Sequence, residues 1–91
     1  MNETTSLVAE IIGSLKELGG TGTLDEIYRK VEQRNRVDLT IYVDWRSRVR
    51  TTIYDHSSDT DRFNGQKQNL FQLVDRKGKG IWQLNRKNNH E

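Results

Sequence analysis

The chain contains no cysteine, and only 32% of its 91 residues are hydrophobic. The absence of cysteine excludes disulfide bonds and metal sites built on thiolates. The hydrophobic share is well below that of a typical globular protein, so we expect a small core and marginal stability. A chain of this length accommodates one small domain and is too short for two.

Long hydrophobic runs are also missing. No stretch approaches the ~18 apolar residues that a transmembrane helix needs. The first residues, MNETTSLVAEIIG, lack the basic region with which a signal peptide begins. We therefore expect a cytoplasmic, nucleoid-associated location.

Charge is distributed unevenly, although the net charge is only +2. Between residues 29 and 50, seven Lys and Arg stand against three acids, and residues 76–87 hold five Lys and Arg and no acid. Such asymmetry is expected of a surface that binds nucleic acid. The alternative is that these side chains form an ordinary solvated surface.

Apolar spacing predicts helices in the first part of the chain. Leucines and isoleucines recur every three or four residues, which indicates an amphipathic helix over about residues 5–18. Residues 21–23 suit a short strand. Thr23 and Glu26 then fit the S/T-x-x-E capping box of a second helix, over about 24–33.

A third helix is predicted over about residues 43–55, after a loop, with Thr40 or Asp44 as its N-cap. Trp45 lies on one stripe of this helix with the valine and isoleucine four and eight positions later, and this stripe faces the core. The helix is ~20 Å long, which suits a DNA major groove. We expect Trp45 and Trp82 to be core residues rather than stacking platforms for bases, because both lie among apolar neighbours.

The last part of the chain predicts a β-hairpin over about residues 69–85. NLFQLV and IWQLN read as two strands, and DRKGKG between them forms a turn with a basic tip. The remaining residues, 86–91, are a polar tail that we expect to be disordered. The domain therefore covers residues 1–85.

The element order is helix, short strand, helix, helix, hairpin, which predicts an α+β winged helix-turn-helix with three helices and a C-terminal β-hairpin wing. Four segments resemble winged-helix domains of bacterial restriction proteins, often joined to HNH or Mrr-like nucleases, and more distantly HARE-HTH domains. The segments are LGGTGTLDEIY (18–28), WRSRVRTTIYDHSSDTDRF (45–63), NLFQLV (69–74) and GKGIWQL (78–84).

The resemblance implies a module that binds double-stranded DNA, with the third helix in the major groove and the wing on the backbone or minor groove. It also implies a possible role in sensing modified bases for a restriction or defence system. The chain has no nuclease domain of its own, so it is either an excised module or a free-standing protein. A transcriptional regulator without an associated nuclease is an alternative.

Candidate DNA contacts come from three places. The third helix offers arginines that can pair with guanine or phosphate, the hairpin tip offers lysines, and the turn after the helix offers serines. The candidates are Arg46, Arg48, Arg50, Thr51, Tyr54, Ser57, Ser58, Lys77 and Lys79.

The segment HSSDTD at 56–61 has the residue types of a hydrolase site, but adjacent residues rarely meet the geometry of a catalytic triad. His56 with nearby acids is also short of a metal-ligand set. These residue types bond to nearby backbone N–H groups, so we expect them to end the third helix and turn the chain. We predict no enzyme activity, no metal and no cofactor.

A protein-interaction domain is the main competing hypothesis. The loop before the third helix is rich in apolar side chains, and an exposed apolar patch marks an interface. The patch would consist of Val37, Leu39, Ile41, Tyr42 and Val43.

Overall fold

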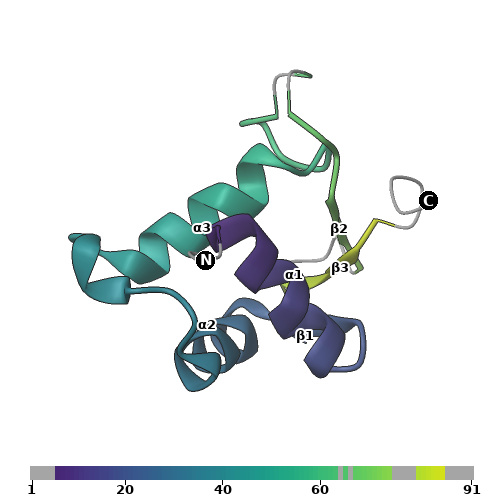
Figure 1. Ribbon diagram of the computed structural model, residues 1–91. Helices are drawn as coiled ribbons and strands as arrows, with labels where there is room; N and C mark the ends of the chain where they lie inside the picture. Colours follow the sequence, from purple (N-terminus) through teal and green to yellow (C-terminus); the bar gives the residue numbers. More distant parts are fainter. Residues whose placement is uncertain (1–5, 64, 66, 75–79, 86–91) are drawn as a thin grey trace.

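A computed structural model describes residues 6–63, 65, 67–74 and 80–85. In these residues the chain forms three α-helices, one 3₁₀ turn and a three-stranded antiparallel sheet (Figure 1). The elements are α1 (Leu7–Glu17), β1 (Thr21–Thr23), α2 (Leu24–Arg34), η1 (Leu39–Ile41), α3 (Trp45–Asp55), β2 (Phe71–Leu73) and β3 (Ile81–Leu84). The predicted α+β class, three helices and strands are confirmed.

Local side-chain chemistry sets the helix ends. The Ser6 hydroxyl accepts a hydrogen bond from the Ala9 amide at 3.1 Å and caps α1. The predicted capping box of α2 is present, since Thr23 Oγ1 accepts from the Glu26 amide at 3.1 Å and Glu26 Oε1 accepts from the Thr23 amide at 2.9 Å. Asn35, with a φ of 51°, ends α2 in the left-handed conformation.

The segment before α3 is more ordered than the predicted loop. It contains the 3₁₀ turn η1, which Asp38 caps by accepting from the Thr40 amide at 3.0 Å. Of the two N-cap candidates for α3, Asp44 holds the position, because its Oδ1 accepts from the Ser47 amide at 3.2 Å. Thr40 lies within η1 instead.

The sheet joins a short strand between α1 and α2 to the last two strands of the described chain. Its strand order is β1-β3-β2, with Gly22 opposite Trp82 and Gln72 opposite Gln83. The short strand predicted at 21–23 therefore pairs with the last strand. The predicted hairpin tip, which carries Lys77 and Lys79, lies outside the described residues.

One core connects the helices to the sheet. In Figure 1, α1 lies between α2 and α3, with the sheet beside it, and α1 also contacts β1 and β3. The buried apolar side chains are Ile11, Leu15, Ile27, Val31, Val49, Ile53, Phe71 and Trp82. Trp82 is a core residue, as predicted, and the half-buried Trp45 packs on the core edge-on to Tyr28, with ring centroids 6.0 Å apart.

A buried ion pair lies between α1 and α2. Glu10 is 1% exposed and its Oε1 lies 2.9 Å from Nε of Arg34, which is 15% exposed and also pairs with Glu17. Gly13 leaves room for this guanidinium, since a Cβ built at Gly13 would lie 2.7 Å from Arg34 Nη2. The Glu10 hydrogen bond is the largest cause of a raised Arg34 pKa. Arg34 is thus a structural residue.

No helix in the described part of the chain is long and apolar enough to cross a membrane.

Candidate nucleic-acid interface

The outer surface of α3 carries the arginines that sequence reasoning selected. Arg46, Arg48 and Arg50 are exposed, whereas Val49 and Ile53 of the same helix are fully buried. At about 100° per residue, Arg46 and Arg50 lie along one edge of the exposed surface and Arg48 lies along the other. The three arginines therefore occupy two edges of the helix.

Ser47 and Thr51 lie between these two edges, opposite the buried stripe, and both are half-exposed. Their hydroxyls can donate and accept hydrogen bonds. A ligand that approaches α3 from outside therefore meets two small polar side chains in the middle and cations at both sides.

Neighbouring side chains orient the three arginines without neutralising them. The Arg46 guanidinium lies 4.7 Å from the centroid of the Trp45 ring, and that of Arg48 lies 5.6 Å from the centroid of the Tyr42 ring. Arg50 Nη2 donates to Ser47 Oγ at 3.4 Å. Aromatic faces and a hydroxyl restrict the side chains while leaving the positive charges in place.

The basic residues of α2 differ in this respect. Arg29 pairs with Asp25 at 3.1 Å, Lys30 lies 3.9 Å from Glu17, and Arg34 is held by two carboxylates. Within the described part of the chain, none of the three α3 arginines forms an ion pair with a carboxylate. Among the described basic residues of α2 and α3, those without an ion pair therefore lie on α3, where Arg50 also attracts the Asp44 carboxylate without forming an ion pair.

Asp44 lies at the start of this surface, and its side chain caps the helix. Besides the backbone bond, its Oδ2 accepts from Ser47 Oγ at 2.8 Å. The hydrogen bonds from the Ser47 side chain and backbone lower the Asp44 pKa below its ordinary value of 3.8. The carboxylate is thus engaged in the cap, the role for which Asp44 is one of the two sequence candidates.

One predicted contact residue, Ser57, is not open to a ligand in this structure, and this expectation is corrected, whereas Tyr54 is only partly exposed. Tyr54 is half-buried, because its ring packs on Trp82 with centroids 5.7 Å apart. Ser57 is fully buried, and its hydroxyl accepts from the Asp59 amide at 3.2 Å. Helical spacing does not reveal these contacts, because the partner of Tyr54 comes from the distant strand β3.

The segment 56–60 ends α3 and attaches it to the sheet. The His56 carbonyl accepts from the amides of Leu70 and Phe71 at 2.7 and 3.0 Å. His56 Nδ1 donates to the Thr52 carbonyl at 2.8 Å, and Thr60 Oγ1 donates to the Tyr54 carbonyl at 2.6 Å. These bonds support the prediction that the polar residues stop the helix and turn the chain.

Further side chains of this turn bind the chain before β2. Asp59 Oδ2 accepts from the Leu73 amide at 2.9 Å. The Ser58 amide donates to Asn69 Oδ1 at 3.0 Å, and Asn69 Nδ2 donates to Ser58 Oγ at 2.9 Å. Ser58 is exposed but already has a partner, so its proposed contact with DNA would compete with this bond.

Among the described residues, no group of three or more His, Asp or Glu could hold a metal ion.

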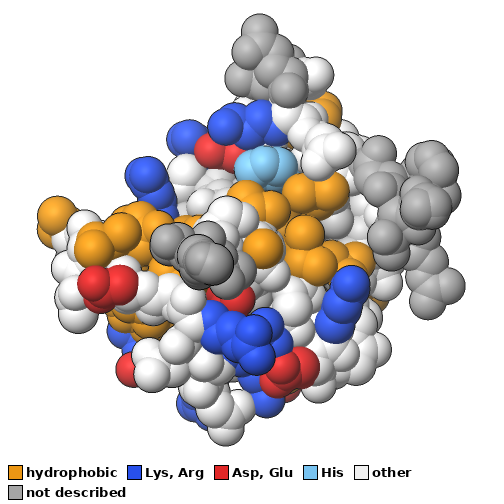
Figure 2. Space-filling view, in the orientation of Figure 1, with side chains coloured by type: hydrophobic (Ala, Val, Ile, Leu, Met, Phe, Trp, Pro, Cys, Tyr) orange, Lys and Arg blue, Asp and Glu red, His pale blue; other side chains and the backbone are white. Residues whose placement is uncertain are grey.

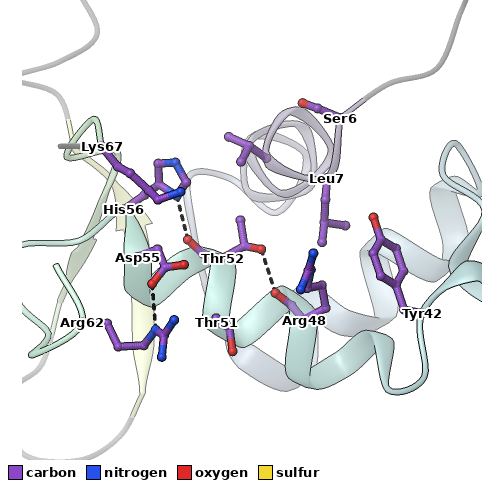
Figure 3. A pocket seen from close by; sticks show the side chains of 11 residues that line it. Ser6, Leu7, Tyr42, Arg48, Thr51, Thr52, Asp55, His56, Arg62 and Lys67 are labelled. Atoms are coloured by element: carbon purple, nitrogen blue, oxygen red, sulfur yellow. Dashed lines mark hydrogen bonds and ion pairs between the residues drawn. The ribbon is translucent and has the colours of Figure 1, made fainter. Parts of the chain in front are cut away.

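Two hollows flank the Arg48 edge of α3. The first, of about 380 Å³, lies between the start of α1 and α3 (Figure 3). Arg62 at its far end donates to Asp55 Oδ1 at 2.7 Å. Its lining residues are Ser6, Leu7, Val8, Tyr42, Arg48, Thr51, Thr52, Asp55, His56, Arg62 and Lys67.

The second hollow, of about 440 Å³, lies between η1 and the first half of α3. Its lining residues are Ile41, Tyr42, Val43, Asp44, Ser47, Arg48 and Thr51. Tyr42, Arg48 and Thr51 line both hollows, so the Arg48 edge is grooved along much of the helix. Figure 2 shows hydrophobic side chains at the left end of the molecule, over the segment that precedes α3.

Searches against known protein families, curated proteins and solved structures give no match. Function is therefore inferred from the geometry of α3 and its surroundings. That geometry brings together Arg46, Arg48, Arg50 and Thr51 from the predicted set. Of the other five candidates, Tyr54, Ser57 and Ser58 have packing or hydrogen-bond partners, and Lys77 and Lys79 lie outside the described residues.

Proposed function

We propose that the chain is a winged helix-turn-helix module that binds double-stranded DNA, with α3 as the recognition helix. The observation that carries the proposal is the set of three exposed arginines on α3, none of which pairs with a carboxylate among the described residues. Phosphates supply the negative charge that this surface lacks. An α-helix fits the width of the major groove.

The two arginine edges suggest how the helix would sit in the groove. Arg46 and Arg50 would approach the phosphates or base edges of one strand, and Arg48 those of the other. Ser47 and Thr51, which lie between the two edges, would face the base pairs. The sequence-predicted wing, with Lys77 and Lys79 at its tip, would contact the backbone or the minor groove beside this site.

The wider role that we propose follows the sequence resemblance. The module would be the DNA-recognition or modified-base-sensing part of a restriction or defence system, with a nuclease as partner in the parent protein. A protein-interaction domain remains the second candidate, because Ile41 and Val43 are exposed hydrophobic side chains.

The direct test is a titration of duplex DNA against the wild-type chain and the double variant Arg46→Ala/Arg50→Ala, at two salt concentrations. The variant should lose more than about ten-fold in affinity, and the slope of log K against log salt should fall by about 1.8, since each phosphate contact contributes about 0.9. Unmodified, methylated and hydroxymethylated duplexes should be compared, because a large ratio between them would identify a sensor of base modification.

The matched control is Lys16→Ala/Arg29→Ala, which removes the same charge from exposed positions on α1 and α2. Its affinity should change much less than that of the α3 variant. An equal loss in both variants would mean that net charge, rather than α3, governs binding. Absence of binding by the wild-type chain at low salt would refute the proposed function.

A further inference from the structure

Two aliphatic side chains just before α3 are exposed to solvent. Val43 is 108% exposed, as open as in an unfolded chain, and Ile41 is 68% exposed. The backbone at both positions is nevertheless fixed. Ile41 is the last residue of η1, and Asp44, which follows Val43, is the N-cap of α3. Exposed apolar area is unfavourable in water, so a fixed pair of such side chains indicates a contact made on binding.

The surroundings of this pair are polar and partly cationic. Ile41 and Val43 line the 440 Å³ hollow together with the ring of Tyr42. The polar part of the lining consists of Asp44, Ser47, Arg48 and Thr51, with one negative and one positive charge. An occupant should therefore present an apolar group beside hydrogen-bonding groups, with its negative charge on the side of Arg48 and away from Asp44. Base edges in the major groove, bordered by phosphates, have this combination.

A protein partner fits the patch less well. Of the five residues in the sequence-predicted patch, Leu39 packs against the core, and Val37 and Tyr42 are half-buried. Two exposed side chains provide only a small part of the ~800 Å² that each partner buries in a standard interface. The arginines on the adjoining helix also favour an anionic partner over an apolar one.

We propose that Ile41 and Val43 contact the 5-methyl groups of thymines in the major groove, and so contribute sequence preference. The inference rests on the proposed function. The thymine methyl is the apolar group that the major groove presents, and aliphatic side chains recognise it by direct contact. The residues at the start of a recognition helix are those that reach base edges, and Val43 lies immediately before that start.

The test compares two duplexes that differ only in these methyl groups. A binding site is first selected from random duplexes, and its thymines are then replaced by uracils, which keep every hydrogen-bonding group. The wild-type chain should bind the thymine duplex about four-fold more tightly for each contacted methyl, the ratio expected for one buried methyl group. Ile41→Ala/Val43→Ala should bind the two duplexes nearly equally.

The matched control is Val74→Ala, which truncates another exposed hydrophobic residue, 47% exposed and directly after β2. Its thymine-to-uracil ratio should equal that of the wild type. A partly unfolded variant binds both duplexes more weakly, which leaves the ratio of the two affinities unchanged. Circular dichroism of each variant checks its folding.

The other outcomes separate this inference from the proposed function. Equal binding of both duplexes by the wild-type chain overturns the methyl contact and leaves the DNA-binding proposal intact. A ratio that persists in Ile41→Ala/Val43→Ala assigns the methyl contact to other residues and also overturns the inference. No binding to either duplex refutes the proposed function itself. A dimer that the double variant dissociates, measured by light scattering, would assign the patch to self-association instead.

Discussion

At the scale of single residues, the partner of each arginine decides what it can do. Arg34 is held by Glu10 and Glu17, whereas Arg46, Arg48 and Arg50 touch aromatic rings or a hydroxyl. The sequence pattern alone does not separate these cases, because Glu10 is 24 positions away from Arg34. Only the packing of α1 on α2 brings the two together.

The buried pair gives a prediction about stability. Arg34→Met should lower the free energy of unfolding by about 3 kcal/mol, because Glu10 is left charged and buried without its partner. The double variant Glu10→Met/Arg34→Met removes both charges and should be more stable than Arg34→Met alone. Urea unfolding of the wild type, both single variants and the double variant measures the coupling. A double variant as unstable as the sum of the singles would contradict this account.

At the scale of elements, α3 is fixed at both ends by local chemistry. Asp44 begins it, and the turn at 56–60 ends it and bonds to the chain leading into β2. These features could be predicted from sequence because caps and turns depend on residues within a few positions of each other. The 3₁₀ turn η1, the burial of Ser57 and the contact of Tyr54 with Trp82 could not, because they depend on tertiary packing.

The cap of α3 gives a prediction about pH. The Asp44 pKa is lower in the folded chain than its ordinary value of 3.8, so its ionised form favours folding. This contribution is fully present above the ordinary pKa and is lost as the pH falls through the lowered one. The stability advantage of the wild type over Asp44→Asn should therefore shrink as the pH falls from about 5 to about 2.

Asparagine is the matched replacement, because it also caps helices but does not ionise. Urea unfolding at several pH values measures the difference between the two chains. An NMR titration of the Asp44 carboxyl provides the direct check. A midpoint above 3.8 would contradict the cap as described.

At the scale of the whole molecule, the sheet pairs segments that are far apart in the sequence. Strand β1, between the first two helices, pairs with β3 near the other end, and Trp82 of β3 belongs to the same core as the helices. Sequence reasoning found the strands but not this pairing, since a three-residue strand carries too little pattern to identify its neighbour. The helices and the sheet therefore depend on the same core for their stability.

This shared core predicts a single cooperative unfolding transition. In the variant Trp45→Phe, Trp82 is the remaining tryptophan, so its fluorescence reports on the sheet, while far-UV circular dichroism reports on the helices. The two signals should give the same urea midpoint, because α1 contacts both the other helices and β3. Phe71→Ala, which removes a fully buried ring, should lower both midpoints together, with a loss of about 3–5 kcal/mol. Fluorescence that changes at lower urea than circular dichroism would mean that the sheet unfolds while α3, and with it the proposed DNA-binding surface, stays folded.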